Sequence, residues 1–157
     1  MTRLRGRCLR GQRLRCGAPH GHWRTTTVIG SVRVDGTTAC MAIEGATDTA
    51  VFRAFVRDVL VPTLRPGDVV VMDNLIPHKN QKTIALIEAA GATALFLPPY
   101  SPDLNPIELM WSKVKAALRA AEARTHEGLL VALTSALDSI SASDARNWFA
   151  HCGYNFI

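Results

Sequence analysis

Two carboxylates stand where an α/β protein commonly carries out metal chemistry. Asp73 directly follows the apolar run VVVM, and Glu108 is the third residue of a helix predicted to begin at Pro106. In open α/β sheets, ligands collect beyond the carboxyl ends of the parallel strands. The next predicted strand, Thr93–Leu97, leads toward that helix, so neighbouring strands would bring both carboxylates to one crevice. Paired carboxylates suit hard divalent cations such as Mg²⁺.

Each carboxylate also has a purely structural explanation. Asp73-Asn74 is a natural turn pair after any strand. Asn105 followed by Pro106 and Glu108 forms an N-cap, a first-turn proline and a third-position glutamate, which is the pattern of a helix capping box. We call this the third interpretation, after the enzymatic and the non-catalytic ones given below. In it the chain is an unrelated crossover domain, Asp73 only makes a turn and Glu108 only caps a helix.

The elements that must position these residues can be predicted from apolar spacing. Thr25–Val34 and Thr37–Ile43 are rich in β-branched residues and flank Asp35-Gly36, which predicts a β-hairpin. Asp48 is placed to cap a helix whose apolar face ends before Pro62. The run ending at Met72 is continuous enough for a strand covered on both faces.

The second half of the chain alternates between a strand and helices. A helix over His78–Ala90 between two strands predicts a right-handed crossover with parallel strands. Three further helices are expected over Pro106–Ala121, His126–Ile140 and Ser143–Ala150. We expect the aromatic side chains of these helices and of the C-terminal segment to be core residues: Trp111, Trp148, Phe149 and Tyr154.

Composition indicates one domain with an uneven charge. The chain has 157 residues, 48% of them hydrophobic, and a net charge of +5. The first 34 residues contain eight arginines and no Asp or Glu, whereas the remainder is net acidic, an asymmetry typical of a segment that binds polyanions. No apolar run approaches the roughly 18 residues of a membrane span, and no secretory signal is recognisable, so we expect the four cysteines to be reduced.

The sequence around the two carboxylates resembles that of a known family. VVVMDNLIPHK is followed by FLPPYSPDLNPIELMWSKVK, and 34 residues separate Asp73 from Glu108. These motifs, with GQRLR and PHGHWRTTT near the start, resemble the catalytic domain of DDE transposases in the mariner-related superfamily, particularly those of bacterial insertion sequences. The resemblance extends from about Arg3 to Tyr154.

The resemblance implies an α/β fold with an RNase H-like mixed sheet flanked by helices. It implies a two-metal site for Mg²⁺ or Mn²⁺ held by three acidic residues, DNA cleavage at transposon ends, and transfer of the freed 3′ hydroxyl into target DNA. Asp73 matches the second acidic residue and Glu108 the third. A cytoplasmic, DNA-associated protein is expected, without contact to a membrane.

The family's first aspartate has no counterpart in this sequence. It belongs on a strand before the arginine-rich segment, and no acidic residue precedes Asp35. Asp35 is predicted at the hairpin tip, the wrong end of its strand for a shared metal. We therefore expect a truncated domain that lacks its first central strand, is nearly inactive alone and tends to self-associate. Its expected parts are a basic segment (1–24), the sheet and active-site core (25–124) and C-terminal helices (125–157) of a single domain, 1–157.

Other residues are expected near DNA. In the family, the pair His78 and Lys79 borders the active site, so these two residues and Asn74 are candidates for a supporting or DNA-facing role. The alternative function is a non-catalytic DNA-binding remnant that contacts DNA or a full-length transposase, and a homo-oligomer is a further expected partner. DNA-binding candidates are the arginines of the basic segment and two residues on the Glu108 face of the long helix: Arg3, Arg5, Arg7, Arg10, Arg13, Arg15, Lys115 and Arg119.

Overall fold

A β-hairpin forms the middle layer of the molecule. The computed structural model describes residues 6–15, 17 and 25–155. Strands β1 (Thr26–Val32) and β2 (Thr38–Glu44) pair antiparallel in the register that the tight turn imposes. At the tip, the Asp35 carboxylate accepts a hydrogen bond from the Thr37 N–H at 2.9 Å, and Gly36 adopts a positive φ of 89°. The predicted hairpin is confirmed.

The helix after the hairpin begins where its N-cap predicts. Helix α1 (Thr49–Phe55) starts with the Asp48 side chain accepting from the Val51 N–H at 2.8 Å. It then widens into a π-helical turn, η1 (Val56–Leu60), and tightens into a 3₁₀ turn, η2 (Val61–Thr63). Pro62 was expected to lie beyond the helix, but it sits inside this last turn, because proline fits the first positions of a helical turn.

A parallel strand pair follows, joined by a crossover helix as predicted. Strand β3 (Val69–Met72) pairs with β4 (Thr93–Phe96). Between them lie a 3₁₀ turn, η3 (Ile76–Lys79), and helix α2 (Gln81–Ala89). The prediction that this helix begins at His78 was wrong. Asn80 is the N-cap, with its side chain accepting from the Lys82 N–H at 3.1 Å, so His78 and Lys79 lie in the preceding turn.

Three helices complete the described part of the chain. After a 3₁₀ turn, η4 (Pro102–Leu104), α3 (Pro106–Ala121) runs for four turns, followed by α4 (His126–Asp138) and α5 (Ala142–His151). Helix α5 has a full capping box between Ser141 and Asp144. Asp144 also accepts from Lys113 Nζ at 2.7 Å, which ties α5 to α3.

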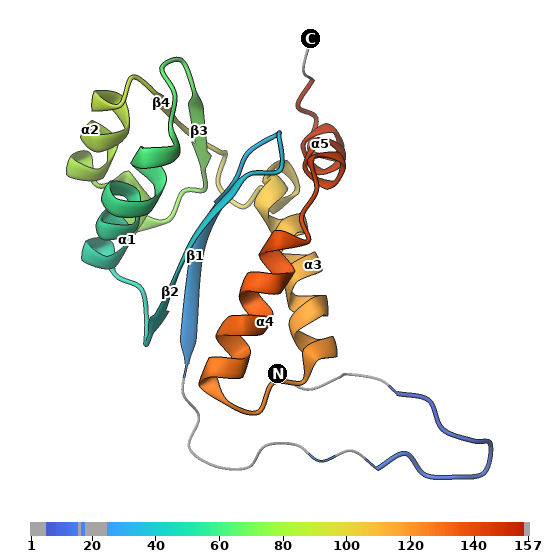
Figure 1. Ribbon diagram of the computed structural model, residues 1–157. Helices are drawn as coiled ribbons and strands as arrows, with labels where there is room; N and C mark the ends of the chain where they lie inside the picture. Colours follow the sequence, from blue (N-terminus) through green and yellow to red (C-terminus); the bar gives the residue numbers. More distant parts are fainter. Residues whose placement is uncertain (1–5, 16, 18–24, 156–157) are drawn as a thin grey trace.

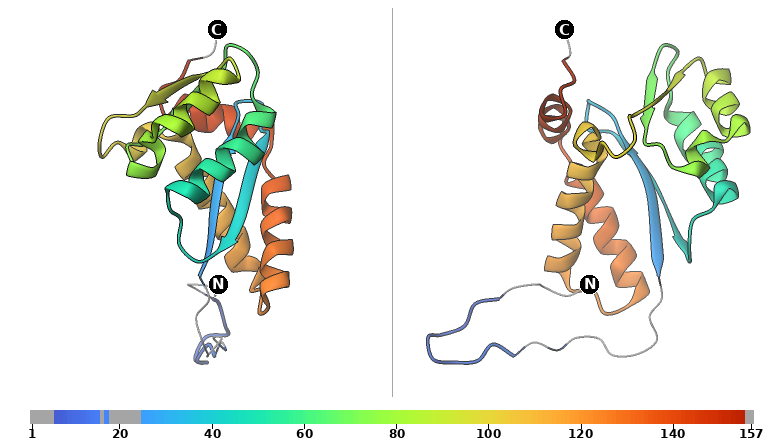
Figure 2. Two further views of the ribbon diagram at one scale, coloured as in Figure 1. Left: turned by 90° about the vertical axis from the view of Figure 1, so that its left-hand side faces the viewer. Right: turned by 180° about the vertical axis from the view of Figure 1, so that it is seen from behind.

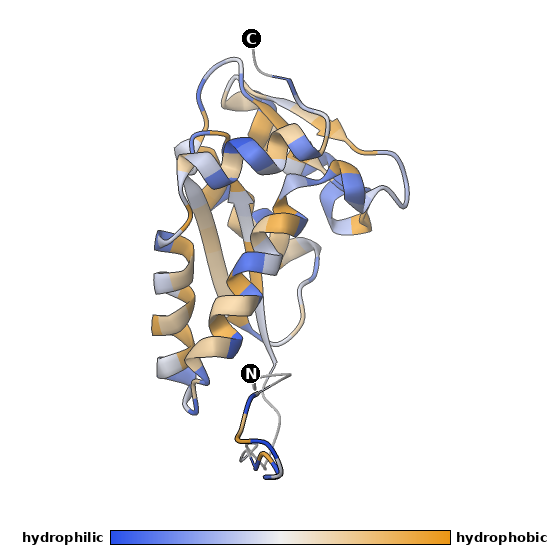
Figure 3. Cartoon of the chain, turned by 90° about the vertical axis from the view of Figure 1, so that its right-hand side faces the viewer, coloured by the Kyte–Doolittle hydropathy of each residue, from blue (hydrophilic) through white to orange (hydrophobic). Residues whose placement is uncertain are grey.

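The hairpin separates two groups of elements (Figures 1 and 2): α1, α2, β3 and β4 lie on one side of it, and α3 and α4 on the other. Because successive strand residues point to opposite faces, Ile29 packs into the first group, whereas Val28 and Val32 pack into the second. Figure 3 shows apolar and polar residues alternating along the helices, as two-sided helices require.

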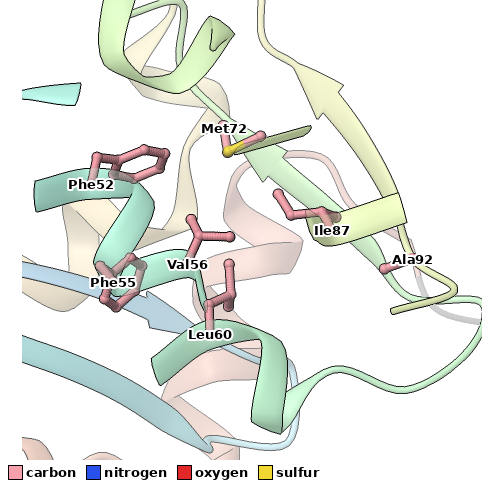
Figure 4. Close-up of a cluster of buried hydrophobic side chains, with 7 residues drawn as sticks. All are labelled: Phe52, Phe55, Val56, Leu60, Met72, Ile87 and Ala92. Atoms are coloured by element: carbon pink, nitrogen blue, oxygen red, sulfur yellow. The ribbon is translucent and has the colours of Figure 1, made fainter. Parts of the chain in front are cut away.

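Each group has its own apolar core. The first core joins α1, η1, α2 and β3, and Figure 4 shows its side chains converging; its buried members are Phe52, Phe55, Val56, Leu60, Met72, Ile87 and Ala92. The second joins α3, α4 and the segment before α5 through Met110, Val114, Leu118, Leu133, Ala136 and Ile140. The aromatic residues expected in the core, Trp111, Trp148, Phe149 and Tyr154, are only partly buried.

The four described strands form two separate sheets, β1–β2 and β3–β4. A cavity of about 790 Å³ is lined by residues 27–34 along β1 and by residues 68–73 along β3; we call it the central slot. The prediction that the Val69–Met72 strand is covered on both faces was wrong at the start of the strand. Val69 is 58% exposed and Leu95 on β4 is 50% exposed, since both side chains line the slot.

An ion pair closes one end of the central slot. Arg33, just after β1, donates to both carboxylate oxygens of Asp68, just before β3, at 2.6 and 2.9 Å. The pair is about one-fifth exposed on each side. The guanidinium hydrogen bond lowers the pKa of Asp68 from 3.8 to about 2. Because β1 and β3 do not pair with each other and no other described strand joins them, this pair is a direct polar link between the two sheets.

Replacing Asp68 by Asn is expected to lower the free energy of unfolding by about 1 kcal/mol at neutral pH, the upper range for a partly screened pair. A depressed carboxyl pKa contributes stability above its unfolded value, and this contribution disappears as the pH falls from about 4 to 2. Urea denaturation should therefore show a shallower acid decline in Asp68→Asn than in the wild type. The exposed pair Arg57–Asp58 supplies the control: Asp58→Asn should leave the curve unchanged. Parallel acid declines for wild type and Asp68→Asn would contradict the role of this pair.

Candidate active site

Asp73 lies at the carboxyl end of β3, as its sequence position predicts. One of its oxygens accepts from the Leu75 N–H at 3.2 Å, which closes a turn. The same oxygen lies 2.6 Å from Nδ1 of His78, although the ring N–H is not aligned for a hydrogen bond. The Asp73 side chain remains 45% exposed. The turn therefore fixes the carboxylate and leaves nearly half of its surface open.

The imidazole ring of His78 packs between Asp73 and Phe52. Its ring stacks on Phe52 of α1 with centroids 4.1 Å apart, and its side chain is only 19% exposed. The neighbouring Asn74 donates its side-chain N–H to the Leu97 carbonyl, which joins the ends of β3 and β4. Lys79 is exposed and lines a cavity with Asp73. Of the three candidates, His78 therefore contacts Asp73, Asn74 joins the two strand ends, and Lys79 places a positive charge beside the cavity that Asp73 lines.

Glu108 lies in the first turn of α3, and its carboxylate is exposed. The expected capping box is not formed: Asn105 is the N-cap and Pro106 the first helical residue, but no side-chain hydrogen bond caps this helix. Within the described part of the chain, the Glu108 carboxylate makes no hydrogen bond or ion pair. The structural explanation from helix capping therefore does not account for this glutamate.

The two carboxylates line the same cavities. Asp73 and Glu108 both line the central slot and a second cavity of about 430 Å³. We call the second cavity the proline pocket, because Pro98, Pro99 and Pro102 form one wall. The third interpretation, in which the two residues serve unrelated local roles, predicted that they would be far apart; their shared cavities argue against it.

The donor set fits a divalent cation. Asp73 and Glu108 supply carboxylate oxygens, the ligands that Mg²⁺ and Mn²⁺ prefer, and Mg²⁺ is commonly held by one or two carboxylates plus phosphate. Among residues 6–15, 17 and 25–155, no cluster of three His, Cys, Asp or Glu side chains suits a metal. Asp35 does not add a third: it lies 3.9 Å from Arg33, at the end of the slot where β3 begins.

Sequence reasoning missed the exposed apolar rim of this site. Tyr100 is fully exposed and lines the proline pocket with both carboxylates. Its φ of 58° is a left-handed conformation, unusual for a bulky residue. Leu75 and Ile76, 57% and 84% exposed, lie on the β3 side of the edge. An aromatic residue inside the proline-rich run PPYSP was the signal that marked this position.

The basic candidates lie on two surfaces. Arg7, Arg10, Arg13 and Arg15 are all exposed on the N-terminal segment, which projects away from the body (Figure 1). On α3, Lys115 is exposed and Arg119 partly buried, and the unbroken helix places both on the Glu108 face. Arg3, Arg5 and the HGHW motif lie outside the described residues.

The fold and site define a class: an α/β domain with two carboxylates at the carboxyl edge of a parallel strand pair. A family profile described as DDE superfamily endonuclease matches residues 1–130. The chain therefore belongs to the DDE superfamily endonucleases. No curated protein matches it.

Family membership sets the broad activity. It implies a transposase-type nuclease function with DNA as substrate, and enzymes of this family generally use divalent metals. The structure agrees in its mixed α/β architecture. None of the helices in the described part of the chain has the length and apolar character that a bilayer crossing requires.

Proposed function

We propose that the chain is the catalytic domain of a DDE transposase of the mariner-related insertion-sequence type, built on an RNase H-like fold. It would cleave DNA at the ends of the element and join the freed 3′ hydroxyl to target DNA. The observation that supports this most directly is that Asp73 and Glu108 line the same two cavities, at the carboxyl edge of the parallel pair.

Each residue of the site has a proposed role in holding either the metal or DNA. Asp73 and Glu108 would hold Mg²⁺ or Mn²⁺, which when bound supplies a Lewis acid for phosphodiester chemistry. His78 fixes the position of Asp73 through their close contact. Lys79 offers an exposed positive charge toward a phosphate, and Tyr100 offers a ring on which an unpaired base can stack. These contacts would orient DNA between the proline pocket and the turn after β3.

Two carboxylates are fewer than the three that the family uses. A site with one ligand missing holds its metal weakly and positions the reacting groups poorly. We therefore propose that this chain is nearly inactive by itself.

A nicking assay tests the assignment. A labelled DNA duplex that carries the insertion-sequence end is incubated with the protein and Mn²⁺, and strand breaks are resolved on a denaturing gel. We expect slow nicking that disappears with EDTA and in Asp73→Ala. Nicking that persists in Asp73→Ala would contradict the catalytic role of this residue. Robust cleavage that requires Asp73 would support the catalytic role and contradict the proposed inactivity.

The second candidate function is non-catalytic DNA binding, and the exposed arginines of the N-terminal segment favour it. Removing one cationic side chain that binds a phosphate makes the slope of log affinity against log salt shallower by about 0.9. Changing Arg7, Arg10, Arg13 and Arg15 together to serine is expected to reduce the slope by about 3 to 4, measured by fluorescence anisotropy with duplex DNA. An unchanged slope would show that these residues do not bind DNA.

A further inference from the structure

The first turn of α3, which carries Glu108, has few local restraints. No side-chain hydrogen bond caps it, and Pro106 has no N–H to contribute. The Glu108 N–H donates to the Asn105 carbonyl at 3.1 Å, so the turn starts from the backbone of Asn105. Because the peptide that joins Leu104 to Asn105 is planar, the groups that hold this peptide also fix the start of α3.

Two hydrogen bonds hold this peptide, one from each side. Its N–H, which belongs to Asn105, donates to the Pro102 carbonyl at 3.0 Å within η4. Its carbonyl, which belongs to Leu104, accepts from the hydroxyl of Tyr154 at 3.0 Å. Tyr154 follows Leu104 by 50 residues, so the second bond is a tertiary contact. It ties the start of α3 to the segment after α5.

The backbone of Tyr154 is fixed by the way α5 ends. Gly153 has a φ of 86°, and its N–H donates to the Ala150 carbonyl at 3.0 Å. The Tyr154 N–H donates to the Phe149 carbonyl, also at 3.0 Å. These two bonds around a left-handed glycine form a Schellman motif. The apolar contact that often accompanies this motif is present as well, because the rings of Tyr154 and Phe149 pack edge to face with centroids 5.6 Å apart.

Helix α5 is attached to α3 at a second point. Lys113 Nζ donates to the Asp144 carboxylate at 2.7 Å and to the Ser139 carbonyl at 3.0 Å. Figures 1 and 2 show α5 beside the first turns of α3. In the sequence, Leu104 precedes Glu108 and Lys113 follows it. Contacts from the α5 region therefore hold the part of the chain that includes Glu108 on both sides of this residue.

Tyr154 lies close enough to the site to affect its geometry. Tyr154 and Phe149 line the central slot together with Asp73 and Glu108. Burial raises the pKa of Tyr154 above its ordinary value, so the hydroxyl stays protonated at neutral pH and can donate. Its proton is used in the bond to the Leu104 carbonyl. Tyr154 therefore acts on the two carboxylates through the backbone of α3.

We propose that Tyr154 is a positioning residue, whose hydroxyl holds the Leu104 carbonyl and thereby sets the place of Glu108 relative to Asp73. The proposal rests on the proposed function, in which these two carboxylates hold the metal. Without the bond, the first turn of α3 adopts further arrangements, and the metal affinity falls with the fraction of molecules in the competent one. The family match ends at residue 130, so family membership assigns no role to α5 or to Tyr154.

Tyr154→Phe tests the proposal, because it removes the hydroxyl and keeps the ring that packs on Phe149. We expect the Mn²⁺ affinity, measured by water-proton relaxation, to fall about twofold to tenfold, the range for the loss of one hydrogen bond. In EDTA, amide hydrogen exchange at Asn105 and Glu108 should become faster by a similar factor. Thr134→Val is the control: it removes a hydroxyl that donates to a carbonyl within α4, at 3.1 Å, and should change neither quantity.

Glu108→Gln distinguishes a positional effect from a general loss of stability. If Tyr154 acts through Glu108, then Tyr154→Phe in a Glu108→Gln background should leave the remaining Mn²⁺ affinity unchanged. Additive losses in the double variant would overturn the proposal, as would wild-type affinity and exchange rates in Tyr154→Phe. If the wild type binds no Mn²⁺, the proposed function fails. Faster exchange at Asn105 and Glu108 in Tyr154→Phe then still supports the positioning of this turn, and unchanged exchange overturns it.

Two glycines provide a second, matched pair of variants. An alanine at Gly153 is strained by its φ of 86° although a Cβ meets nothing within 4 Å, so Gly153→Ala should loosen the Schellman motif and weaken Mn²⁺ binding as Tyr154→Phe does. Gly45 follows β2, has a φ of 98° and also has open space around a Cβ. It lines neither cavity, so Gly45→Ala should leave Mn²⁺ affinity and exchange in α3 unchanged. Equal effects of the two glycine variants would contradict a specific role of the turn after α5.

Discussion

Asp73→Asn is expected to weaken the binding of Mn²⁺ by at least tenfold. Asp73 and Glu108 line the same two cavities, and among the described residues no third acidic or ligating side chain completes a cluster with them. Losing one of two charged ligands leaves a single carboxylate, which holds a divalent ion barely better than solvent-exposed carboxylates do. Calorimetry or the relaxation enhancement of water protons by Mn²⁺ measures the change. Glu108→Gln should have an effect of the same size.

The matched control is Glu88→Gln. Glu88 is an exposed glutamate on α2 that lines neither cavity, so the affinity for Mn²⁺ should stay at the wild-type value. Thermal melting of each variant shows whether the fold is intact. Equal affinity in wild type, Asp73→Asn and Glu108→Gln would refute the proposed metal site, irrespective of any DNA-binding result.

Gly30→Val is expected to lower the free energy of unfolding by about 2 to 3 kcal/mol, the upper range for overpacking. A Cβ on Gly30 would lie 2.6 Å from Sγ of Cys40 and 3.1 Å from the ring of Trp111. Cys40 is its partner across the hairpin, so the added side chain must displace β2, α3 or both. Gly17, where a Cβ meets nothing within 4 Å, is the control: Gly17→Val should unfold like the wild type in urea.

This substitution also tests how the site is held. Trp111 follows Glu108 by one helical turn on α3, so a displaced Trp111 shifts Glu108 relative to Asp73, and Gly30→Val should weaken Mn²⁺ binding as well. The double variant Gly30→Ala with Cys40→Ala removes the closest clash and should be less destabilised than the sum of the single changes. Unaltered stability of Gly30→Val would show that the hairpin and α3 are not in firm contact here.

Local signals were sufficient for most elements. The turn Asp35-Gly36, the cap Asp48 and the proline at Pro106 each act within a few residues. The hairpin and α3 therefore begin and end close to the predicted positions, and α1 begins where its cap predicts. The start of α2 was misplaced because Asn80, a better N-cap, lies two residues after His78. The apolar pattern of the segment gave no means of choosing between them.

The site was predictable in part for the same reason. The edge rule for parallel strands brought Asp73 and Glu108 to one crevice without knowledge of the tertiary structure. The contact of His78 with Asp73 and its stacking on Phe52 depend on how α1 packs against η3, which no local pattern specifies. The exposure of Tyr100 depends on a left-handed backbone that the surrounding prolines do not by themselves require.

The second apolar core extends past the end of the family match. The match stops at residue 130, inside α4, but Leu133, Ala136 and Ile140 lie beyond that point and are buried against α3. The segment that matches the family profile is therefore shorter than the folded domain. A fragment cut at the family boundary would lose Leu133, Ala136 and Ile140, which pack with Met110, Val114 and Leu118 on the helix that carries Glu108. Expressed fragments and domain swaps should take their C-terminal boundary from the packing, after α5, rather than from the matched segment.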